Sequence, residues 1–189
     1  TMYGAMLPAQ AASTLMRWKV EVKDANNIKV AVPPADTAYF FYRVLDRKPT
    51  IADVREPLAR NGNSVYQGYW VTLEGTVTAA ASDILGGGFG APPRIYIQDG
   101  ADGYSALYLR SNSPSAKIRA FSRGDKVRIK GVVIEDFNVT ALDSIANTDA
   151  TLISTGNPLP APHDGVPADF ARQTAGSIFA EPWESMLVE

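Results

Sequence analysis

The sequence contains no cysteine among its 189 residues, which excludes disulfide bonds, thiol nucleophiles, thiolate zinc sites and iron–sulfur clusters. It has one histidine, His163, and this argues against both multi-histidine metal sites and a histidine-based triad. No apolar run reaches the ~18 residues that a membrane-spanning helix needs. The carboxylates form no cluster with ligand spacing, so we expect no catalytic site, no metal site and no cofactor.

The composition is that of a globular protein, with 46% hydrophobic, 10% aromatic and 20% charged residues. The net charge of −2 hides an asymmetry along the chain. Residues 86–135 carry eight basic and four acidic side chains, whereas residues 136–189 carry one arginine and eight acids. Two interpretations stay open: a polyanion-binding face beside a solvating segment, or ordinary scatter of charge.

The first segment, residues 1–62, has the pattern of a β-hairpin followed by a linker. Residues 15–23 alternate strictly between polar and apolar side chains, Asp24 to Asn27 form a turn signal, and residues 38–44 are the expected partner strand. Two strands alone are marginal in water, so this hairpin has to dock on something. In the linker, Thr50 and Asp53 have the spacing of a weak capping box and predict a short helix.

Residues 63–155 predict a barrel of short strands. A short helix is expected within residues 114–121, between the third strand and the fourth, and glycines interrupt the first and fourth strands, where we expect bulges. Five strands in this order predict an all-β, five-stranded Greek-key barrel of the OB-fold type. The expected strands are residues 69–78, 94–99, 104–110, 124–134 and 138–142.

Residues 156–189 read as an acidic, proline-rich tail that wraps the barrel and leads toward a following domain. The chain opens on Thr1-Met2-Tyr3 without the pattern of a signal peptide, and it closes on a strand-like run that no turn follows. We therefore expect this chain to be a piece of a longer protein.

Three motifs and their order carry a resemblance to a known family. They are Val71-Thr72-Leu73-Glu74-Gly75-Thr76-Val77-Thr78, Ile95-Tyr96-Ile97-Gln98-Asp99-Gly100 and Gly124-Asp125-Lys126-Val127-Arg128-Ile129-Lys130-Gly131. From about residue 68 onward the chain resembles the OB-fold modules of secreted bacterial nucleases and related large extracellular proteins. Residues 15–44 are similar, more weakly, to the last strand pair of an immunoglobulin-like module. The resemblance implies a non-catalytic accessory domain of a secreted or cell-surface protein, because nothing in this chain matches the metal-dependent nuclease domain of that family.

Alternation in the second and third barrel strands assigns five side chains to the outer surface. OB-folds bind oligonucleotides and oligosaccharides on this face, so the tyrosines are candidate stacking platforms and the arginines candidate phosphate contacts. Equally, tyrosine and arginine are common on an exposed sheet face for packing reasons alone. The candidate ligand-binding residues are Arg94, Tyr96, Gln98, Tyr108 and Arg110.

A second candidate is the basic stripe, defined as Lys126, Arg128 and Lys130 on one face of the fourth strand. Such a stripe attracts polyanions, but it also protects a sheet edge from pairing with other chains, and we favour edge protection or plain solvation. The glycines at 86–88 predict a flexible loop rather than a phosphate loop. The Asp99–Asp102 pair predicts a hairpin turn rather than a calcium site.

Two functions therefore compete. A structural module would fix neighbouring domains of the same protein, and we favour this reading. A binding module would hold single-stranded nucleic acid or a polysaccharide across the second and third strands. Whether residues 156–189 cover that face decides much between them.

Overall fold

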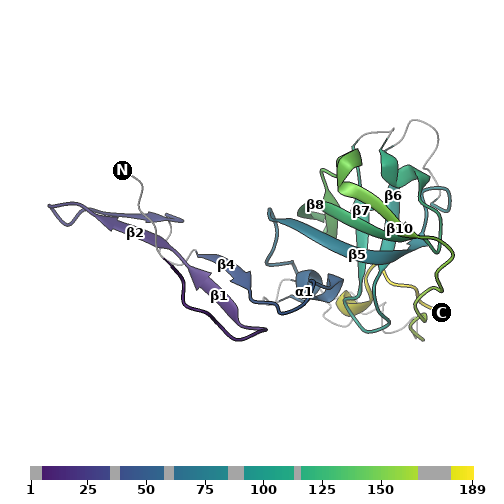
Figure 1. Ribbon diagram of the computed structural model, residues 1–189, viewed down its shortest axis with the longest axis horizontal. Helices are drawn as coiled ribbons and strands as arrows, with labels where there is room; N and C mark the ends of the chain where they lie inside the picture. Colours follow the sequence, from purple (N-terminus) through teal and green to yellow (C-terminus); the bar gives the residue numbers. More distant parts are fainter. Residues whose placement is uncertain (1–5, 35–38, 58–61, 85–91, 113–115, 166–179) are drawn as a thin grey trace. The chain divides into compact units, whose positions relative to one another are not determined.

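The computed structural model describes residues 6–34, 39–57, 62–84, 92–112, 116–165 and 180–189 (Figure 1). The chain divides into two compact units, Thr1–Lys48 and Pro49–Glu189. This division lies on the N-terminal side of the boundary expected near residue 62, because the linker helix packs with the barrel. Within the described ranges, no helix has the length and apolarity of a membrane span.

The described residues of the first unit form two separate antiparallel strand pairs. The long strand expected over residues 15–23 is interrupted at Lys19, so that its two halves pair with different partners. The predicted turn is confirmed: the Asp24 carboxylate accepts hydrogen bonds from the amides of Asn26 and Ile28, both at 2.8 Å. The pairs are β1 (Leu15–Trp18) with β4 (Phe40–Arg43), and β2 (Val20–Lys23) with β3 (Lys29–Val32), of which β3 was not predicted.

Helix α1 (Ile51–Arg55) begins the second unit at the predicted capping box. The Asp53 amide donates to the Thr50 hydroxyl at 3.3 Å, and the Thr50 amide donates to the Asp53 carboxylate at 2.8 Å. The main-chain amide of Ile51, in the first turn of the helix, donates a hydrogen bond to the carboxylate of Asp99 at 2.8 Å. Because Asp99 directly follows a barrel strand, this bond pins the start of the helix to the barrel.

The predicted barrel is confirmed, and it is closed. The strands pair in the order β10-β8-β5-β6-β7-β9, and a further pairing of β8 with β9 completes the ring. All pairs are antiparallel except β7 with β9, which is the arrangement of a five-stranded OB-fold, and β10 is an additional strand outside β8. The strands are β5 (Trp70–Ala79), β6 (Arg94–Gln98), β7 (Ala106–Arg110), β8 (Lys126–Asp136), β9 (Val139–Asp143) and β10 (Ala150–Ser154).

Among the described residues, three short 3-10 helices occupy the connections and the tail: η1 (Lys117–Ala120), η2 (Asn147–Asp149) and η3 (Glu181–Trp183). The first lies between the third and fourth barrel strands, as predicted, although residues 114–115 of the expected helix lie outside the described residues. The glycine-rich loop at 86–88 also lies outside them.

The core fills the barrel with inward-facing aliphatic side chains from every strand. Gly75 and Gly131 do not mark bulges, because both lie in regular pairs and the register shifts instead between Val77 and Ala79. They are glycines because the barrel is tight there: a Cβ on Gly131 would lie 2.8 Å from the main-chain oxygen of Asp143. Fully buried core side chains include Leu73, Val77, Ile95, Ile97, Leu107, Leu109, Val127, Ile129, Val133 and Leu142.

The described parts of the tail lie on the barrel unit. The Asn157 amide donates to the carbonyl of Gly124 at 2.8 Å, and His163 forms a parallel bridge with Val188. The ring of His163 stacks on Trp183 with 3.4 Å between ring centroids. Residues 166–179 of the predicted tail lie outside the described residues.

Candidate functional site

The β6–β7 face brings four of the five candidate ligand residues together in two cross-strand pairs. Tyr96 lies opposite Tyr108 and Arg94 lies opposite Arg110. The two tyrosine rings are in contact, with 5.3 Å between centroids and 31° between planes. The sequence therefore placed these side chains on one surface correctly.

Tyr108 is not available as a stacking platform, which corrects the expectation from alternation. It is only 6% exposed, since its ring is covered by neighbours that include Tyr96. Burial is also the main reason that the pKa of Tyr108 is raised above its usual value. Tyr96 keeps part of its ring in solvent. A base could reach one tyrosine here, and not the predicted pair.

Arg110 is already occupied by two carboxylates. Its Nη1 lies 2.7 Å from Asp136 and its Nε lies 3.2 Å from Asp143. The hydrogen bond to Asp136 is the largest cause of a pKa raised above the ordinary arginine value. Contact with a phosphate would have to compete with these two ion pairs, so Arg94, which is exposed, is the more accessible cation of this face.

Gln98 was predicted to face outward, and it is fully buried instead, because the end of the chain covers it. Its amide nitrogen donates to the carbonyl of Gly100 at 2.7 Å, and its amide oxygen accepts from the main-chain amide of Leu187 at 3.1 Å. Tyr104 likewise donates its amide to the carbonyl of Pro182. The C-terminal segment therefore occupies the end of the β6–β7 face that begins at Gln98 and Ala106.

The basic stripe is exposed on the outer surface, as predicted, but it does not protect a sheet edge. The part of β8 that carries Lys126 and Arg128 lies between β5 and β10, paired on both sides. Pairing on both sides argues against edge protection at Lys126 and Arg128, whereas plain solvation, the other expectation, agrees with the exposure of all three residues. Arg128 forms an ion pair with Glu74 at 2.7 Å, and the Nζ of Lys130 lies 5.4 Å from the ring centroid of Trp70.

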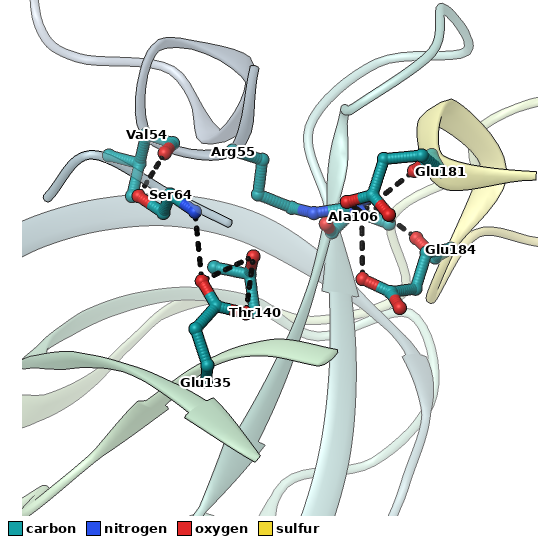
Figure 2. Close-up of polar contacts among 8 residues, drawn as sticks. All are labelled: Val54, Arg55, Ser64, Ala106, Glu135, Thr140, Glu181 and Glu184. Carbon is teal, nitrogen blue, oxygen red and sulfur yellow. Dashed lines mark hydrogen bonds and ion pairs between the residues drawn. The ribbon is translucent and has the colours of Figure 1, made fainter. Parts of the chain in front are cut away.

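Sequence reasoning missed a buried arginine that joins three parts of the second unit (Figure 2). Arg55, in the last turn of α1, is fully buried. It donates to the carbonyl of Ala106 at 3.0 Å, to the carbonyls of Glu181 and Glu184 at 3.0 and 2.7 Å, and to the Glu184 carboxylate at 3.0 Å. We call Arg55, Ala106, Glu181 and Glu184 the Arg55 clamp. A signal did exist: Arg55 follows the buried Ile51 by four residues and so shares its helix face.

Burial dominates the electrostatics of the Arg55 clamp. It lowers the pKa of Arg55, with the charges of Glu184 and Glu181 opposing the shift. It raises the pKa of Glu184 to about 7 and raises the pKa of Glu181, with the Arg55 charge opposing in both cases. The cation thus compensates two carboxylates that the C-terminal segment brings out of solvent.

A second polar contact fixes the chain that follows the helix (Figure 2). The Ser64 hydroxyl donates to the carbonyl of Val54 at 2.6 Å, and the Ser64 amide donates to the carboxylate of Glu135 at 2.8 Å. The same carboxylate accepts from the Thr140 hydroxyl at 3.2 Å. The connection from α1 to the first barrel strand is therefore tied to β8 and β9.

The carboxylates were expected to form no catalytic or metal-binding cluster. Among the described residues, no group of three or more histidine or carboxylate side chains is placed to hold a metal ion. The carboxylates with raised pKa values are Glu181 and Glu184, and both face Arg55 rather than an open cleft. Asp99, one of the two carboxylates considered as a calcium ligand, accepts a hydrogen bond from the main-chain amide of Ile51. The absence of enzymatic activity stays a prediction.

Comparison with known proteins adds two similarities in structure. No protein-family model and no curated protein matches the sequence. Asparaginyl-tRNA synthetase from Pyrococcus horikoshii is similar with a TM-score of 0.42 and 15% identity, over 61% of this chain and 25% of that chain. The same enzyme complexed with asparaginyl-adenylate is similar with a TM-score of 0.43 and 15% identity, over 62% of this chain and 25% of that chain. The matched region thus spans a quarter of those chains, and the barrel is assigned here from its own strand order.

Proposed function

We propose that this chain is a non-catalytic structural module, in which an OB-fold barrel holds helix α1 and the C-terminal segment in fixed positions. The observation that carries the proposal is the Arg55 clamp. One buried side chain joins helix α1, the first residue of β7 and the C-terminal residues 181–184. Helix α1 and residues 181–184 therefore meet at the start of β7.

The state of the β6–β7 face supports the same conclusion. Gln98 is taken up by the C-terminal segment, Tyr108 is buried and Arg110 is held by two aspartates. On a ligand-binding face we would expect these groups to be free of such bonds, because breaking each existing bond on binding lowers the affinity for the ligand. The setting we propose, a secreted or cell-surface multidomain protein of bacterial origin, is supported by the sequence resemblance alone.

Double electron–electron resonance, which measures the distance between two spin labels, tests the proposal directly. Because the chain has no native cysteine, labels can be attached at two introduced cysteines alone. Spin labels at Asn112→Cys and Asp164→Cys, both exposed positions, would report how the tail sits on the barrel. We expect a single narrow distance distribution that broadens when Arg55→Met is added. A broad distribution in the parent chain would show that the tail is not held, and the structural role would fail.

Binding of an oligonucleotide or glycan on the β6–β7 face is the second candidate. It is favoured by the exposed Arg94, by the partly open Tyr96 and by Phe137, which is 95% exposed in the turn beside Asp136. The combined Arg94→Ala and Tyr96→Ala variant tests it: weaker binding of a labelled single strand or oligosaccharide would support this site.

A further inference from the structure

The outer surface of β5, β8 and β10 presents an aromatic ring beside a row of cations, and neither proposed role uses it. Trp70 is 56% exposed, although indole is among the largest apolar groups that a protein can bury. The Nζ of Lys130 lies 5.4 Å from the ring centroid. We call this surface the Trp70 face, and it consists of Trp70, Thr72, Glu74, Lys126, Arg128, Lys130 and Thr151.

Strand register decides that these side chains share one surface. Thr72 lies opposite Lys130, Glu74 opposite Arg128, and Thr151 of β10 opposite Arg128 on its other side. The intervening residues, such as Leu73 and Ile129, point into the core and are buried. Alternate residues of a strand lie ~7 Å apart on one face, so the three cations form a row of about 14 Å.

The charges of this face are incompletely compensated. Glu74 is committed to Arg128 at 2.7 Å. Across the described ranges, no carboxylate forms an ion pair with Lys126 or Lys130, and both are exposed. Glu181 and Glu184 of the C-terminal segment are engaged at the Arg55 clamp instead. The face therefore carries an excess of positive charge in solvent.

We infer that the Trp70 face binds single-stranded nucleic acid. A row of cations can follow a phosphate backbone, and an exposed aromatic ring gives an unpaired base a surface on which to stack. The hydroxyls of Thr72 and Thr151, both on exposed residues, add neutral donors of the kind that contact phosphates. An acidic peptide would use the cations but would leave the indole without a planar partner, so the combination favours nucleic acid.

The test is a fluorescence anisotropy titration of the whole chain against a labelled single-stranded DNA of about ten thymidines, at low and moderate salt. We expect micromolar binding at low salt. Trp70→Ala should weaken it by about tenfold or more, because stacking on an aromatic side chain contributes ~1–3 kcal/mol per base. Trp70→Phe should retain part of the affinity. Circular dichroism confirms that each variant is folded, which is expected because Trp70 is largely exposed.

Charge variants and a matched control complete the design. Replacing Lys126 and Lys130 by glutamine should lower the slope of log affinity against log salt by about 0.7 for each phosphate that the variant no longer neutralises. Lys117→Gln, an exposed lysine that belongs to neither face, is the matched control and should leave binding unchanged, whereas Tyr96→Ala tells the two faces apart. No binding at low salt, or binding that depends on Tyr96 rather than Trp70, would overturn the inference. Equal affinity for dextran sulfate without dependence on Trp70 would also overturn it, since the face would then be a simple polyanion exchanger.

Discussion

Arg55→Met is the sharpest test of how this module is held together. The change keeps most of the side-chain volume and removes every donor. The buried guanidinium makes four hydrogen bonds, to the carbonyls of Ala106, Glu181 and Glu184 and to the Glu184 carboxylate, at distances between 2.7 and 3.0 Å. Hydrogen bonds to a charged group contribute about 1.5–3 kcal/mol each, so the gross loss is large.

The net loss is smaller, because methionine also removes the desolvation penalty of the cation, and Glu184 can regain water or a proton. Breaking a buried ion pair from one side typically costs about 3–5 kcal/mol, and we expect a value in this range for Arg55→Met. For a unit of this size, each kcal/mol shifts the melting temperature by about 3–4 °C, so a loss of about 3–5 kcal/mol predicts a fall of about 9–20 °C.

Urea unfolding measures the stability of the variant, and hydrogen exchange shows where the change acts. The amides of Leu187 and Glu189, which bond to Gln98 and His163 in the parent, should lose more protection than amides of the barrel strands. The matched control is Arg94→Met, an exposed arginine, which should change stability by less than about 0.5 kcal/mol. If Arg55→Met lowered the free energy of unfolding by less than about 1 kcal/mol, the reasoning would be refuted. Equal loss of exchange protection in the C-terminal segment and in the barrel strands would also refute it.

Three further changes probe the barrel and its pH response. Gly131→Ala should destabilise by about 1–3 kcal/mol in urea unfolding, because its Cβ would lie 2.8 Å from the main-chain oxygen of Asp143 and backbone cannot yield as a side chain does. Because burial raises the pKa of Glu184 to about 7 from 4.5, the folded state holds this proton more tightly than the unfolded chain. Stability should therefore fall as pH rises from about 4.5 to 7, and Glu184→Gln should flatten that part of the urea-midpoint profile. Phe137→Gly should leave the free energy of unfolding unchanged or raise it by up to about 1 kcal/mol in urea unfolding, since Phe137 is exposed and has a φ of 55° that glycine adopts freely. A clear loss of stability in that variant would mean that the ring packs on something after all.

The alternation of polar and apolar residues along the strands predicted most of the fold. Alternation along residues 69–142 identified five strands in the right order, and the short helix between the third and fourth completed the barrel. The capping box at Thr50 and the turn at Asp24 were also readable, because each depends on bonds within a few residues. Two strands escaped prediction, Lys29–Val32 and Ala150–Ser154, since each is short and is stabilised by the partner that it meets.

Alternation also placed Arg94, Tyr96, Tyr108 and Arg110 on one surface, yet it left their availability undecided. Whether an outward side chain meets water depends on chain that is distant in sequence: Leu187 covers Gln98, and Asp136 and Asp143 hold Arg110. In the same way, Arg55 looks like an ordinary helix residue until the segment 129 positions further on supplies its acceptors. Strands, turns and caps depend on residue periodicity and on bonds within a few residues, so the sequence by itself determined them. Burial and pairing between remote segments depend on the tertiary structure, because it alone brings those segments together.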